Sequence, residues 1–193
     1  MDFPEYAKVG NKKYKINTDF RVAIKCNSVA NDRNIGDYER ALAIIYMLYG
    51  DEGLKAKQDH NKLLEIAKKY LSCGEEVVDN VEEPDMDFEE DMNYIEASFM
   101  SDYRMDLSKE KMHWWKFYNL INGLSDSEMG NSCVLNRIRS LRKYDVSKIE
   151  DRKEREKIIR AKEKFALKKY KKEENLTDEQ LKSIDEFNKM LFS

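Results

Sequence analysis

The stretch YIEASFMSDYRMDLSKEKMHWWKFYNLINGL, residues 94–124, holds both tryptophans of the chain and its most apolar predicted helix. It indicates two helices joined by a turn at residues 104–107. On the second helix Trp114, Phe117 and Ile121 recur at helical spacing, and Trp115 lies at the edge of the same face. Fully burying side chains of this size contributes about 2 to 3 kcal/mol each. We therefore predict that this helix forms the centre of the core.

The helix before this turn is predicted to begin at Asp87. Its apolar positions Phe88, Met92, Ile95 and Phe99 follow one another at i, i+4, i+7 and i+11, which is typical of a buried seam. The residues predicted to be structural are Phe99, Trp114, Trp115, Phe117, Tyr118 and Ile121. A capping role is predicted for Ser108 at the start of the second helix.

The first half of the chain predicts a hairpin followed by two helices. Lys13–Asn17 and Phe20–Cys26 alternate apolar and polar residues, a pattern that favours two short strands. A helical stripe from residue 37 is stopped by Gly50, and a second stripe ends before Gly74. The predicted fold class is therefore mainly α, a helical bundle of about six helices with a short N-terminal β-hairpin.

The C-terminal part combines high charge with few apolar positions. Residues 1–145 are predicted to form the core domain, and residues 146–193 a charged helical extension. Its apolar residues must fold back, mediate dimerisation or bind a partner, because a large exposed apolar patch is unusual on a monomer. The candidate partner-binding residues are Ile158, Ile159, Phe165, Leu181, Ile184, Phe187 and Leu191.

Charge is distributed unevenly along the chain. Residues 75–91 hold ten carboxylates and no Lys or Arg, whereas residues 137–172 hold sixteen Lys and Arg against six Asp and Glu. The acidic segment 75–87 is predicted to be a mobile loop. Both segments are interpreted as solvated, as surfaces for a partner of opposite charge, or as partners of each other. Phosphate binding by the basic segment is a further alternative, disfavoured because its cations are interleaved with Glu.

Motifs for catalysis, metals and cofactors are missing from the sequence, so we predict a protein that is not an enzyme and has no cofactor. The alternation of Asp85, Asp87, Glu89 and Asp91 imitates a calcium loop, but Glu90 stands where such a loop requires glycine. Three well-separated cysteines and the absence of a leader or a long apolar run favour a reduced, non-secreted protein outside the membrane.

Four short motifs follow one another along the chain. They are Asp19–Val22 (DFRV), Leu48–Gly50 (LYG), Tyr103–Leu107 (YRMDL) and Met112–Phe117 (MHWWKF), the last two being the most specific. On these motifs the chain resembles the bacteriophage gene product fifteen family, found in tail modules of long-tailed phages and prophages of Gram-positive bacteria. The resemblance covers about residues 13–170.

This resemblance implies a tail assembly protein, with a chaperone-like role toward the tail tape-measure protein. It carries no catalytic residues. A minor structural component of the tail is the first alternative, and a nucleic-acid-binding regulator is a second one from another class. The expected partners are the tape-measure protein or other tail proteins, with homo-oligomerisation as an option. The expected location is the host cytoplasm during assembly, or else the virion tail.

Overall fold

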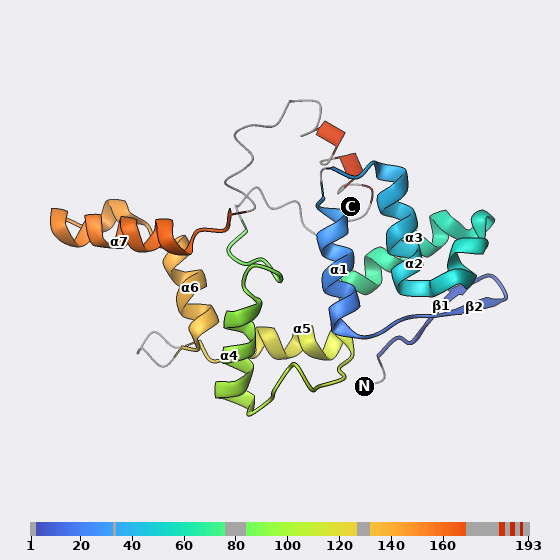
Figure 1. Cartoon of the computed structure of the whole chain (residues 1–193), viewed down its shortest axis with the longest axis horizontal. Helices are drawn as coiled ribbons and strands as arrows, with labels where there is room; N and C mark the ends of the chain where they lie inside the picture. The colour runs from blue at the N-terminus through green and yellow to red at the C-terminus, as the bar shows by residue number, and fades with distance from the viewer. Residues whose placement is uncertain are drawn as a thin grey trace. The chain divides into compact units, whose positions relative to one another are not determined.

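The computed structural model describes residues 3–32, 34–75, 84–126 and 132–168, together with 182–183, 186–187 and 190. The described chain is mainly α-helical with a short N-terminal hairpin, as predicted (Figure 1). In chain order the elements are β1 (Tyr6–Val9), β2 (Lys12–Lys15), α1 (Phe20–Ala30), α2 (Asp37–Lys55), the 3-10 turn η1 (Lys57–Asp59), α3 (His60–Leu71), α4 (Met92–Tyr103), α5 (Trp114–Asn122), α6 (Val134–Lys143), the 3-10 turn η2 (Val146–Lys148) and α7 (Arg152–Phe165).

Two compact units make up the chain. The first comprises residues 1–81, 111–119 and 176–193, and the second comprises residues 82–110 and 120–175. This division differs from the predicted boundary at residue 145. Charge composition suggested a continuous core domain, but residues 111–119 pack with the N-terminal elements, whereas the charged helix α7 packs on α6.

The N-terminal hairpin lies earlier in the chain than predicted. Strand β1 pairs antiparallel with β2, and Ala7 lies opposite Tyr14. The predicted second strand over Phe20–Cys26 is wrong, because these residues begin α1. The Asp19 carboxylate accepts a hydrogen bond from Arg21 N at 2.9 Å and caps that helix. The apolar residues between Phe20 and Cys26 are also compatible with one buried helix face when the buried Ala23 is included.

Helix α2 contains a break at the glycine predicted to end it. Gly50 has φ +64° and ψ −158°, after which the helix resumes and runs to Lys55. The Tyr49 hydroxyl donates to Leu63 O at 2.9 Å and joins α2 to α3. Gly50 is therefore a kink within α2 rather than its end.

Helix α5 begins later than predicted, and Ser108 does not cap it. The His113 Nδ1 atom accepts a hydrogen bond from Trp115 N at 3.0 Å and so caps the first turn of the helix. The Nε2 atom of the same ring then carries the proton and donates to Pro4 O at 3.1 Å. Phe20 N donates to Met112 O at 3.0 Å, and Trp114 N donates to Thr18 O at 2.8 Å. These pairings hold residues 112–113 extended, so the helix starts at Trp114.

The second unit contains α4, the end of α5, α6 and α7. Phe99 and Ile121 are both buried in it. Ser98 Oγ accepts from Leu135 N at 3.1 Å, and the Asn136 side chain donates to Leu124 O at 3.3 Å. These bonds fix the start of α6 against α4 and the residues after α5.

Candidate interaction surfaces

The two tryptophans of α5 are attached to the end of α3. Trp114 is 1% exposed, and its Nε1 donates to Leu71 O at 3.0 Å. Trp115 is half-buried, and its Nε1 donates to Tyr70 O at 2.9 Å. Each indole thereby donates to a carbonyl in the last turn of α3, and the Tyr70 carbonyl also accepts from Cys73 N at 3.1 Å. Both indoles are thus built into the fold rather than presented as a ligand platform.

The other predicted structural residues of α5 differ in burial. The Phe117 ring is buried and stacks on Phe20 with ring centroids 4.3 Å apart. Tyr118 is half-buried, and its hydroxyl donates to a carboxylate oxygen of Glu75 at 3.1 Å. The face of α5 within the first unit is therefore apolar at Phe117 and polar at Tyr118.

A buried ion pair fixes α6 in the second unit. The Arg142 guanidinium donates to both carboxylate oxygens of Asp91, at 2.6 and 2.7 Å, and the two side chains are 10% and 1% exposed. It also donates to Asp85 O at 2.8 Å and to Phe165 O at 2.7 Å. Burial opposes the charge of Arg142, but the hydrogen bond with Asp91 and the negative charges of Asp91 and Glu90 together outweigh burial and raise the arginine pKa. One side chain thus joins α6, the start of α4 and the end of α7.

Asp85, in the described part of the acidic segment, pairs with the basic segment. Pairing of these two segments with each other is one of the alternatives given for them above. Asp85 accepts from Arg139 at 3.2 Å and from Lys143 at 3.1 Å. Burial disfavours the ionised Asp85, but the hydrogen bonds and the positive charges of Lys143 and Arg139 together outweigh burial and lower the pKa of its carboxyl. The segment 75–87 is predicted to be a mobile loop. Most of it, residues 76–83, lies outside the described residues.

Helix α7 is attached through its C-terminal half only. Phe165 contacts Tyr94 edge-on with ring centroids 6.3 Å apart, and Lys162 Nζ donates to Tyr144 O at 2.6 Å. Ile158 is half-buried, whereas Ile159 is 37% exposed. Residues 151–157 are all exposed. Four exposed cations share one face of the helix at i, i+4, i+7 and i+11, namely Lys153, Lys157, Arg160 and Lys164.

Phe187 is covered rather than free for a partner. It is 1% exposed, and the guanidinium carbon of the buried Arg40 lies 4.1 Å from its ring centroid. An aromatic face is a favourable cover for a buried cation. For this residue the structure corrects the predicted partner-binding role and matches the folded-back alternative. The other C-terminal candidates, Leu181, Ile184 and Leu191, lie outside the described residues.

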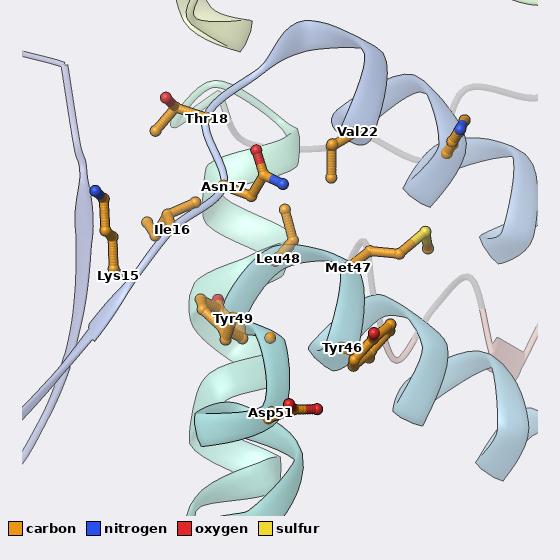
Figure 2. A pocket seen from close by; sticks show the side chains of 12 residues that line it. Lys15, Ile16, Asn17, Thr18, Val22, Tyr46, Met47, Leu48, Tyr49 and Asp51 are labelled. Atoms are coloured by element: carbon orange, nitrogen blue, oxygen red, sulfur yellow. The ribbon is translucent and has the colours of Figure 1, made fainter.

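A groove with a volume of about 810 Å³ lies in the first unit, where the connector after β2 passes α1 and the kink of α2 (Figure 2). We call it the Tyr46 groove. It is lined by Lys15, Ile16, Asn17, Thr18, Val22, Lys25, Tyr46, Met47, Leu48, Tyr49, Gly50 and Asp51. The sequence analysis did not predict this groove. The available signal was that Tyr46 and Met47 are large apolar residues outside the apolar stripe of their helix.

The cysteines and carboxylates of the described chain have structural surroundings. Burial raises the pKa of the Cys26 thiol to about 12, and that of Cys73 likewise to about 12. Cys133 Sγ accepts from Asn136 N at 3.4 Å at the start of α6. The Asp85 and Asp91 carboxylates of the calcium-like pattern are paired with arginines. Within the described ranges no cluster of three or more His, Cys, Asp or Glu side chains could hold a metal ion.

Comparison with protein families agrees with the resemblance drawn from the YRMDL and MHWWKF motifs. The family model described as "Bacteriophage Gp15 protein" matches residues 3–167. The chain therefore belongs to the bacteriophage Gp15 family. Searches among curated proteins and among solved structures gave no match. The matched region ends two residues after α7, so Phe187 lies outside it. None of the helices in the described part of the chain is long and apolar enough to cross a membrane.

Proposed function

We propose that this phage protein is a non-enzymatic tail assembly factor, a chaperone-like partner of the tail tape-measure protein. Membership of the bacteriophage Gp15 family is the observation that carries the proposal. The family resemblance implies a place in the tail module beside the tape-measure protein. A tape-measure chain is long and helical and exposes apolar seams until the tail tube encloses it. A partner in the host cytoplasm that covers such seams would keep the chain soluble until assembly.

The geometry of α7 supports this role. The helix is attached at its last turns by Phe165 and Lys162, and its first turns are exposed. Ile159 lies on an exposed part of the same helix. An amphipathic helix can pair with another helix through apolar anchors at helical spacing. We assign Ile158 and Ile159 to this contact, with self-association through the same face as an option, whereas Phe165 holds the helix on Tyr94.

Affinity capture with the tape-measure protein of the same phage tests the proposal. We expect the wild-type chain to retain the tape-measure protein and Ile159→Ser to retain less. Met100→Ser on α4 is the matched control, because Met100 is also an exposed apolar residue in the second unit. Equal retention by wild type and both variants would remove α7 from the contact, and no retention by any of them would refute the partnership.

A minor structural component of the finished tail is the alternative within the same class. Mass spectrometry of purified virions separates the two roles. The chaperone role predicts the protein in infected-cell lysate and its absence from virions, whereas a tail component persists in virions at a fixed ratio to the tube protein.

A nucleic-acid-binding regulator is favoured by one observation, the basic stripe on α7. Lys153, Lys157, Arg160 and Lys164 are exposed along three helical turns. Phosphate binding through four cations would weaken steeply as salt rises. DNA binding at low salt that is lost in Lys153→Glu with Lys157→Glu would support the regulator, and absence of binding would exclude it.

A further inference from the structure

The Tyr46 groove has an apolar floor and partly exposed apolar walls. Ile16 and Leu48 are buried beneath it, and Val22 and Met47 are half-buried at its sides. Tyr46 is 53% exposed although it lines the groove. Figure 2 shows these side chains coming from the connector, α1 and α2. Tyrosine and methionine are enriched at protein interfaces, because they offer large contact areas and adaptable shapes.

Three backbone groups of the connector beside the groove are already paired. Ile16 N donates to Glu5 O at 2.8 Å, and Asn17 N donates to Leu48 O at 2.7 Å. Thr18 O accepts from Trp114 N at 2.8 Å. An extended peptide added to this connector would find these three backbone groups occupied, which favours recognition through side chains. The same hydrogen bonds order the groove wall in the absence of a partner, so binding would cost less conformational entropy.

Gly50 shapes the end of the groove. Its φ of +64° and ψ of −158° belong to a region that essentially only glycine occupies. A Cβ atom at this position would meet nothing within 4 Å, so the backbone conformation and not lack of space requires glycine. The break turns α2 between Tyr49 and Asp51, which both line the groove.

The charge of the groove selects the chemistry of an occupant. Lys15 and Lys25 are both exposed, and they line the groove from β2 and α1. Asp51 is the only carboxylate among the lining residues. An apolar floor between two cations is complementary to an apolar seam flanked by carboxylates.

From these observations we propose that the Tyr46 groove docks an acidic amphipathic helix of a partner protein. Apolar anchors of that helix at i, i+3 or i+4, and i+7 contact Tyr46, Met47 and Val22, and its flanking carboxylates face Lys15 and Lys25. This surface is separate from the α7 contact assigned above, so the proposal does not depend on the tape-measure partnership.

Binding of two designed peptides to the full-length chain tests the proposal by fluorescence anisotropy. Both peptides are helical, about 18 residues or five turns long, and carry the same leucine seam. One has glutamate at the flanking positions and the other has lysine. We expect the glutamate peptide to bind about fivefold more tightly, because two rim cations each contribute modestly. The double variant Lys15→Glu with Lys25→Glu is expected to reverse the preference.

A matched pair of tyrosine variants locates the contact. Tyr46→Ser is expected to weaken the glutamate peptide about tenfold, as for an aromatic residue central to an interface. Tyr38→Ser is the control and should leave binding unchanged, because Tyr38 is 67% exposed on the same helix but does not line the groove. Circular dichroism before and after heating establishes that each variant is folded.

Four results would overturn the proposal. Equal affinity for the two peptides would show that charge does not select the occupant. An equal effect of Tyr38→Ser and Tyr46→Ser, or no binding of either peptide, would remove the groove as the docking site. A concentration-dependent dimer in light scattering that Tyr46→Ser abolishes, without peptide binding, would assign the groove to a second copy of this chain.

Discussion

Replacement of Trp114 by alanine tests the packing of α5 on α3. The side chain is 1% exposed, and its ring lies 5.9 Å from Phe117 and 5.7 Å from Tyr118, centroid to centroid. Removing a buried aromatic side chain of this size costs about 3–5 kcal/mol. The substitution also leaves Leu71 O without its indole donor. The free energy of unfolding of a domain is about 5–15 kcal/mol, so this loss would remove a large part of it.

Two milder variants separate the contributions. Trp114→Phe keeps an aromatic ring but lacks the N–H, so it should cost about 1–3 kcal/mol for the unpaired carbonyl and the smaller ring. Trp115→Phe removes the bond to Tyr70 O from a half-buried ring and should cost less than Trp114→Phe. The assay is urea unfolding followed by circular dichroism at pH 7. Trp114→Ala with a wild-type midpoint, or Trp115→Phe costing more than Trp114→Phe, would refute this packing.

Four further predictions concern other parts of the chain. Arg142→Ala should cost about 3–5 kcal/mol in urea unfolding, because the buried Asp91 loses its partner, and a smaller cost would show that water reaches the carboxylate. Asp85→Asn should be less stable than wild type at pH 7. The difference should shrink below about pH 4, because a carboxyl whose pKa is lowered by folding stabilises the fold only while it is ionised. A constant difference down to pH 2 would contradict that linkage. Cys26 should react with a thiol reagent at pH 8 only after unfolding, because burial raises its pKa to about 12, and prompt labelling of the native protein would contradict it. Gly50→Ala should cost about 1–3 kcal/mol through backbone strain, and an unchanged melting temperature would exclude the positive φ.

Local patterns were sufficient to predict much of the fold. The apolar spacing around Phe99 and Phe117 identified two buried helix faces, and Gly50 marked a real break in α2. The motifs ending in HWWKF also indicated the family. These features depend on residues close together in the chain, where the helical period governs which side chains share a face.

Predictions failed where distant residues or competing periods determine the result. Phe20–Cys26 fits both a strand and a helix, and the Asp19 cap with the buried Ala23 favours the helix. The late start of α5 depends on pairing with Thr18, nearly a hundred residues earlier. The buried Arg142–Asp91 pair likewise joins residues that only the folded chain brings together. Within the first unit, the Tyr46 groove needs three separate segments, so no single motif could reveal it.

Co-expression with the tape-measure protein tests the central functional claim most directly. The two chains are produced together, and the soluble fraction is separated by size-exclusion chromatography with light scattering. A chaperone-like partner predicts that the tape-measure protein becomes soluble and co-elutes with this chain at a defined mass. A tape-measure protein that remains insoluble, or elutes alone at the same yield with and without this chain, would contradict the proposed function.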